Sequence, residues 1–216
     1  MSQVWEALSV PEIYQIIGFM AFYAVVVPSF GAFDYYFMLD VVGITQFQYS
    51  MLSVLHFVCM LIGSYLFRRW LKDTEVRTLT IIEVLIGLLL APFTMMFVTR
   101  TNVQLIGLSD GFIIIFTDII GDIFSMCLVV LPISVLFNRV CPKHIEATCF
   151  AMLAGIYNAK NGLRHFTGTW INDHFVGVTK DNLDDFWKLK VITLCCSCLP
   201  LLAIRLIPTK AQIELR

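Results

Sequence analysis

A chain of 216 residues with 58% hydrophobic and only 14% charged residues is too apolar for an ordinary soluble domain, in which about a quarter of the residues are charged. Its 15 basic residues face 16 acidic ones, so no basic surplus indicates nucleic-acid binding, and so apolar a chain is not disordered. We therefore expect an integral membrane protein that does not bind nucleic acid.

Six apolar segments follow one another along the chain, and each is close to the length of about 20 residues that crosses a bilayer as a helix. They cover residues 13–39, 46–67, 79–98, 111–137, 147–170 and 186–206. Pro28 and Gly31 predict a kink near the end of the first segment, and Pro132 lies inside the fourth. The segments predict one all-α membrane domain of six transmembrane helices over residues 1–216.

The charged loops predict the orientation of this domain. Basic residues gather in the loops after the second and fourth segments and in the C-terminal tail: Arg68, Arg69, Lys72, Arg77, Arg139, Lys143, Lys210 and Arg216. The positive-inside rule places this end, with both termini, in the cytosol, or in the matrix or stroma of an organelle. We expect an organelle inner membrane, mitochondrial or plastid, with the plasma membrane as the alternative. Lys188 and Lys190 are expected to snorkel outward from the last segment.

Four charged residues lie deep in the predicted membrane, Asp118 and Asp122 in the fourth segment and Lys160 and Arg164 in the fifth. If the two segments form a hairpin about Pro142, each acid has a base at its own depth. An unpaired charge at this depth costs about 2.5–3.5 kcal/mol, so we expect Asp118 to pair with Arg164 and Asp122 with Lys160. Two interpretations stay open: a substrate or proton pathway, and a charge-paired seam that fixes helix packing or faces a partner.

Other titratable residues are weaker candidates for the same pathway. Glu83 is expected to pair with Arg77 or to snorkel toward the basic side. Asp34 lies near the opposite interface, where it is a gate candidate, and His165 is a titratable neighbour of the deep cations. His56, alone in an apolar segment, is expected to be a hydrogen-bonded core residue.

No pattern in the chain indicates metal binding or catalysis. The seven cysteines form no CxxC pair and lie mostly in apolar runs, so we expect them to pack as small hydrophobic residues. No set of three or four metal ligands, no glycine-rich phosphate loop and no Ser–His–Asp arrangement has the required spacing. We expect no metal, no cofactor apart from bound lipids, and no enzymatic activity.

Short motifs occur in a fixed order along the chain: V-P-S-F at 27–30, F-R-R-W-L-K-D at 67–73, T-N at 101–102, L-I-G-L-S-D at 105–110, V-C-P-K at 140–143, E-A-T at 146–148, F-A-M-L at 150–153 and N-L-D-D-F-W at 182–187. This ordered set resembles the C-terminal half of the folate–biopterin transporters, a branch of the major facilitator superfamily. The resemblance implies six helices that form one half of a twelve-helix carrier, with substrate between the halves. Asp118 and Asn158 match polar positions of the family, whereas Lys160 and Arg164 stand where the resemblance puts Gly and another small residue.

Two functions follow from these observations. The first is a structural accessory subunit of a larger membrane complex, favoured by the absence of the other six-helix half and by the two additional cations. The alternative is a half-transporter for organic anions such as folates and pterins, which works as a homodimer or with a separate N-terminal half. The expected partners are other membrane subunits or a second six-helix half, lipids, and a folate or pterin if transport is retained.

Overall fold

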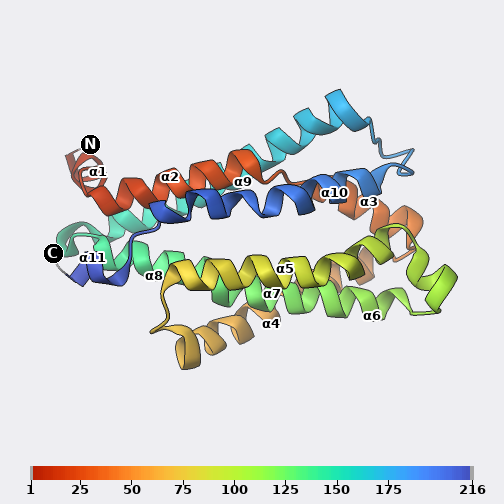
Figure 1. Ribbon diagram of the computed structural model, residues 1–216, viewed down its shortest axis with the longest axis horizontal. Coiled ribbons are helices and arrows are strands. Elements are labelled where there is room, and N and C mark those ends of the chain that lie inside the picture. Colours follow the sequence, from red (N-terminus) through yellow and green to blue (C-terminus); the bar gives the residue numbers. More distant parts are fainter. Residues whose placement is uncertain (1, 215–216) are drawn as a thin grey trace.

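Long helices lie side by side along the long axis of the molecule, with α1 and α11 at the same end of the bundle (Figure 1). The computed structural model describes residues 2–214, apart from the side chains of residues 2–4, 143 and 214. Short π-helical and 3-10 turns, labelled η, interrupt the α-helices. In chain order the elements are α1 (Ser2–Leu8), α2 (Pro11–Val26), α3 (Gly31–Tyr36), η1 (Phe37–Val41), α4 (Gln46–Leu66), η2 (Phe67–Leu71), α5 (Val76–Val98), η3 (Asn102–Ile106), α6 (Asp110–Ile114), η4 (Ile115–Ile119), α7 (Ile120–Ser125), η5 (Met126–Val130), α8 (Leu131–Val140), η6 (Lys143–Ile145), α9 (Glu146–Ile171), η7 (Asn172–Val176), α10 (Phe186–Ser197), η8 (Leu199–Leu206) and α11 (Lys210–Glu214).

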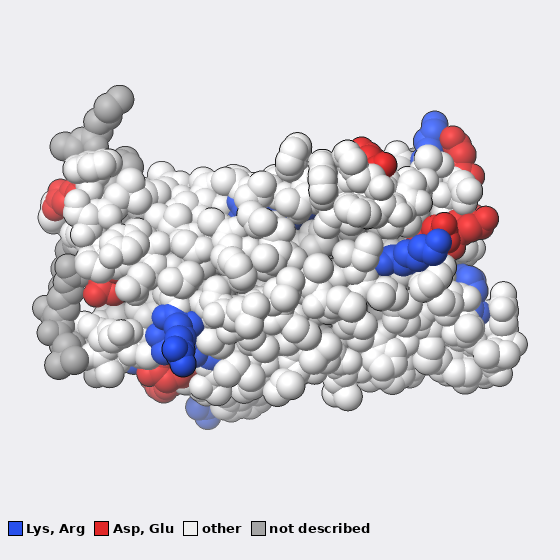
Figure 2. Space-filling view, turned by 45° about the horizontal axis from the view of Figure 1, so that its top comes forward, with Lys and Arg blue, Asp and Glu red and all other residues white. Residues whose placement is uncertain are grey.

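The apolar helices confirm an all-α, multi-pass integral membrane protein. Four helical stretches between residues 2 and 214 are long and apolar enough to cross a bilayer, namely Gln46–Leu71, Val76–Val98, Asp110–Val140 and Phe186–Ile213. Pro11–Val26 and Gly31–Val41 meet the same test together, as one pair bent by 54°. On the face shown in Figure 2, most charged atoms lie toward the two ends and leave a largely uncharged band between them.

The predicted fifth span corresponds to α9, which is long but more polar than the others. This helix has 26 residues and includes both Lys160 and Arg164, and it is not among the stretches that meet the length and hydropathy test. The count of six transmembrane helices and the side of the membrane that each end faces therefore stay predictions.

The first span is broken where proline predicts it. Pro28 has no N–H to continue the helix and restricts the residue before it, so Val27 is extended and α2 ends at Val26. The break leaves backbone groups without helical partners, and α9 supplies them: Arg164 Nε donates to the Val27 carbonyl at 2.9 Å, and the Ser29 N–H donates to the Arg164 carbonyl at 3.0 Å. One turn further on, the backbone of Gly168 lies directly against the Ser29 carbonyl. The bent first span is thus fastened to α9.

Helices that follow each other in the chain are not the closest neighbours throughout the bundle. The helix packed along α7 is α4, where Gly63 allows a close approach: a Cβ there would lie 2.7 Å from the Ile123 carbonyl oxygen. In contrast, α9 packs mainly along α2. The fourth and fifth predicted segments meet near their turn at Pro142 but do not stay together over their whole length.

The turn between α8 and α9 carries a disulfide that the sequence does not predict. Cys141 and Cys149 are joined, with their Cα atoms 6.4 Å apart, so the expectation that all cysteines act as small hydrophobic residues is wrong for these two. The helical turn of η6 and α9 brings the eighth residue after Cys141 back beside it, a proximity that apolar composition does not reveal. The other five cysteines are free.

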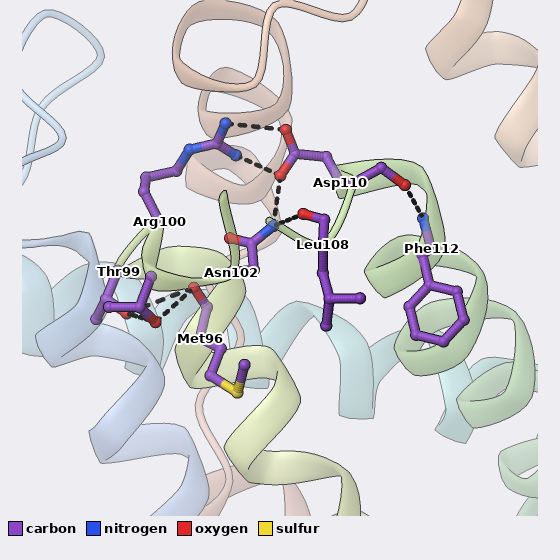
Figure 3. Close-up of polar contacts among 9 residues, drawn as sticks. Met96, Thr99, Arg100, Asn102, Leu108, Asp110 and Phe112 are labelled. Atoms are coloured by element: carbon purple, nitrogen blue, oxygen red, sulfur yellow. Dashed lines mark hydrogen bonds and ion pairs between the residues drawn. The ribbon is translucent and has the colours of Figure 1, made fainter. Parts of the chain in front are cut away.

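At the other end of the bundle, a polar clamp closes the connection between α5 and α6 (Figure 3). The guanidinium of Arg100 donates two hydrogen bonds to Asp110, at 2.7 and 2.9 Å, and the amide of Asn102 donates to both Asp110 and the Leu108 carbonyl. Gly107 makes this turn in the left-handed conformation, with φ of 72°. The clamp fixes the position at which the fourth segment begins.

Candidate functional site

A polar cavity of about 470 Å³ lies between α3, α4, the α6–α7 segment and α10. Its polar lining consists mainly of Asp34, Tyr49, His56, Asp118, Asp122 and Lys190. These side chains come from four separate parts of the chain, and the bend after α2 is what brings Asp34 to the cavity. Few polar groups are found in the middle of an apolar bundle, so their convergence makes this cavity the candidate functional site.

Two of the three carboxylates in the cavity already have partners. Asp34 forms an ion pair with Lys190, and Asp122 lies 2.5 Å from Nδ1 of His56. Asp118 is different, because one oxygen accepts a hydrogen bond from the neighbouring Thr117 hydroxyl at 3.0 Å, while no described residue donates to the other. The cavity therefore presents one carboxylate with an unused acceptor.

The pairing that we predicted for the deep charges is wrong. Neither Asp118–Arg164 nor Asp122–Lys160 is among the ion pairs of the described residues, because α4, and not α9, packs beside Asp122. Equal depth along two helices does not determine which faces they turn toward each other. The cations of α9 point instead toward α2, where Arg164 binds the Val27 carbonyl.

A second polar cluster, separate from the cavity, surrounds these cations. The ammonium of Lys160 lies 5.2 Å from the ring centroid of Tyr23 and 5.0 Å from that of Tyr157, within range of cation–π attraction. Glu83 lies close enough to Lys160 and Arg164 to interact electrostatically with both. The acidic residue near Lys160 and Arg164 thus comes from α5, and not from the fourth predicted segment as we expected.

The expectation that Glu83 pairs with Arg77 or snorkels is also wrong. The guanidinium of Arg77 instead donates to the backbone carbonyls of Ile207 and Arg205, at 2.7 and 3.0 Å. This contact ties the start of α5 to the end of η8. Glu83 is left free to face the interior cations.

The remaining candidates from the sequence do not gather at one place. Asn158 is exposed on α9, and the imidazole of His165 lies against Gly31 at the edge of the cavity. The basic-side residues Arg68, Arg69 and Lys72 are exposed near the start of α5, whereas the side chain of Lys143 lies outside the described part of the structure.

Sequence reasoning missed three residues that line the cavity. His56 is not a core residue, since 45% of its side chain is exposed, and Lys190 turns inward to Asp34 instead of snorkelling. Tyr49 also lines the cavity, where its ring packs edge-on against Tyr35 at 4.9 Å. Polar residues within the apolar segments of α4 and α10 were the available signal, but the sequence does not show which helices face them. No group of three or more potential ligands within residues 2–214 could hold a metal ion.

Comparison with known proteins identifies the family. The model of the BT1 family matches residues 1–215. The chain belongs to the BT1 family. It is 26% identical to the probable folate-biopterin transporter 4 of Arabidopsis thaliana and 29% identical to the folate-biopterin transporter of Synechocystis sp., and covers 41% of each relative with 95% of its own length.

A third relative, the probable folate-biopterin transporter 7 of Arabidopsis thaliana, is 26% identical, with 94% of the chain covering 45% of the relative. The chain thus spans less than half the length of these relatives. No solved structure matches it. The predicted resemblance to folate–biopterin transporters is confirmed, and the chain is a membrane protein of a transporter family.

Proposed function

We propose that this chain forms one half of a membrane carrier for pteridine compounds, and that the polar cavity is its part of the transport pathway. The observation that carries the proposal is Asp118, a carboxylate with an unused oxygen that lines a half-open cavity on an apolar bundle. A carboxylate at membrane depth is costly unless it contacts water, a cation or a polar solute. A transported solute with hydrogen-bond donors would be such a contact.

The exposure of the cavity supports the view that it is half of a larger site. The side chains of His56 and Asp122 are 45% and 33% exposed, although both lie in helices that are apolar enough to cross a membrane. Lipid tails cannot satisfy such groups, so water or further protein must cover them. A second six-helix bundle would enclose the cavity, whether it is a second copy, a separate chain or another part of a longer product.

Uptake into liposomes tests this proposal directly. The full chain, with whatever co-purifies under gentle extraction, is reconstituted, and entry of radiolabelled pterin and folate is compared with empty vesicles. We expect pteridine uptake that falls at least tenfold in Asp118→Asn, because loss of a charged hydrogen-bond acceptor typically changes binding by that order. Asp173→Asn removes an exposed carboxylate of η7 outside the cavity and should leave uptake unchanged. No uptake above empty vesicles would contradict the proposal.

The accessory-subunit function predicted from the sequence stays a prediction, and it predicts other experimental results than the carrier function does. It requires that protein permanently covers the cavity face, so the chain would migrate in a large complex of fixed stoichiometry and show no uptake. Native mass spectrometry after gentle extraction separates the two functions, since a carrier half should be found as a dimer or with one six-helix partner. The compartment, and the absence of enzymatic activity, likewise stay predictions.

A further inference from the structure

The charges around the cavity bear on which of two kinds of pteridine it binds: uncharged pterins, or folates, which carry a glutamate tail. We infer that this cavity binds an uncharged pterin ring and disfavours the glutamate tail of folate. The inference rests on the proposed carrier function, and it adds which chemical form of the solute the site accepts. It depends on the charge balance of the lining and on the unused acceptor of Asp118.

Among the residues that line the cavity in the described part of the chain, no lysine or arginine is free to receive a carboxylate solute. Three carboxylates line it against one lysine and one histidine, and Lys190 is already paired with Asp34. His56 is paired with Asp122 in the same way. A carboxylate that enters would therefore meet a site with excess negative charge, which repels it.

The other cations at membrane depth do not change this balance. Lys160 and Arg164 belong to the cluster of Tyr23 and Glu83 between α2, α5 and α9, and neither lines the cavity. Arg164 is occupied by the Val27 carbonyl, which has no other side-chain donor among the described residues. These two cations, which the sequence placed among the candidates for a substrate pathway, therefore lie outside the cavity.

An uncharged pterin fits the groups that remain. Its pyrimidinone edge carries an N–H and an adjacent amino group, two parallel donors that match the two oxygens of a carboxylate. Asp118 can accept both, since its Thr117 contact uses only one lone pair of one oxygen. The aromatic rings of Tyr49 and His56 line the same cavity, so a flat bicyclic ring bound to Asp118 would lie among aromatic side chains.

The amino group makes the inference testable with a closely matched compound. Lumazine has a carbonyl in place of the amino group of pterin, so it presents an acceptor where Asp118 needs a donor. Sites built to bind a donor discriminate strongly against analogues that lack it. Asp118→Asn should reverse this preference, because the asparagine amide can donate to the lumazine carbonyl.

The experiment measures binding of tritiated pterin to the full chain in nanodiscs, together with its co-purified partners, in competition with unlabelled pterin, lumazine and folate. We expect lumazine and folate to require about 10- to 100-fold higher concentrations than pterin for half displacement. In Asp118→Asn, pterin should bind about 10- to 100-fold more weakly, and binding of tritiated lumazine should become the stronger. Asp173→Asn should retain the wild-type order.

The outcomes separate the inference from the proposed function. Folate that competes as well as pterin, or lumazine that does so, overturns the selection while the carrier function stands. An unchanged order in Asp118→Asn overturns the role of this carboxylate. If no pteridine binds to the wild-type chain, both the carrier function and the selection are overturned.

Discussion

The contact between Gly168 and Ser29 makes a specific prediction about stability. In Gly168→Ala the new Cβ would collide with the Ser29 carbonyl, 3.0 Å from its carbon and 3.2 Å from the Ser29 nitrogen. Backbone cannot rotate away as a side chain does, so relief requires separation of α9 from the break, at about 1–3 kcal/mol for such overpacking. Loss of the Ser29–Arg164 backbone hydrogen bond adds about 1 kcal/mol. The two costs together are about 2–4 kcal/mol, and the higher helix propensity of alanine reduces the expected net destabilisation to about 1–3 kcal/mol.

A second glycine on the same helix provides the control. Nothing lies within 4 Å of a Cβ built at Gly162, so Gly162→Ala gains the same helix propensity, about 1 kcal/mol, without a collision. Thermal unfolding in detergent should therefore give Gly168→Ala a lower Tm than Gly162→Ala, by about 2–4 °C per kcal/mol for a chain of this size. Equal Tm values would refute the close packing of α9 against the break.

Three further predictions concern other contacts. Glu83→Gln leaves the interior cations without a counter-charge and should lower the Tm of the chain, whereas Lys160→Met, which removes one excess cation, should lower it less in the same denaturation assay. Arg100→Met removes the bidentate contact to Asp110 and should cost about 1.5–3 kcal/mol, seen as a lower Tm. Maleimide labelling of denatured, unreduced wild-type protein should find five of the seven cysteines as free thiols, because Cys141 and Cys149 form a disulfide that Cys149→Ser removes. Labelling of all seven cysteines in the wild-type protein would contradict the disulfide.

The positions of four long apolar helices could be predicted from hydropathy, because the length of an apolar run and the bilayer thickness are directly related. The break after α2 was equally predictable, since proline acts locally. The π-helical turns could not be predicted, because a helical turn with one additional residue requires no particular amino-acid composition. The polarity of α9 shows the limit of the same approach: charges that the fold uses internally lower the hydropathy of the helix that carries them.

The candidate site was predicted only in part, for a reason visible in Asp122. Its depth in the membrane was available from the sequence, but its partner depended on which helix packs against α7 and on the rotation of that helix. The partner was His56 on α4, brought close by Gly63, and not a residue of the next helix in the chain. The depth of a polar residue in the membrane shows that it needs a partner, whereas the packing of the helices determines which residue that partner is.

The contacts of the two cations that depart from the family pattern also change how these residues are interpreted. In the sequence, Lys160 and Arg164 appeared to fill space between helices and to argue against a carrier. In the structure, Arg164 satisfies the carbonyl that the break after α2 exposes, and Lys160 lies between two tyrosines beside Glu83. The break directs α3 so that Asp34 reaches the cavity. These cations therefore hold the bent span that shapes the site, and their presence is compatible with transport through it.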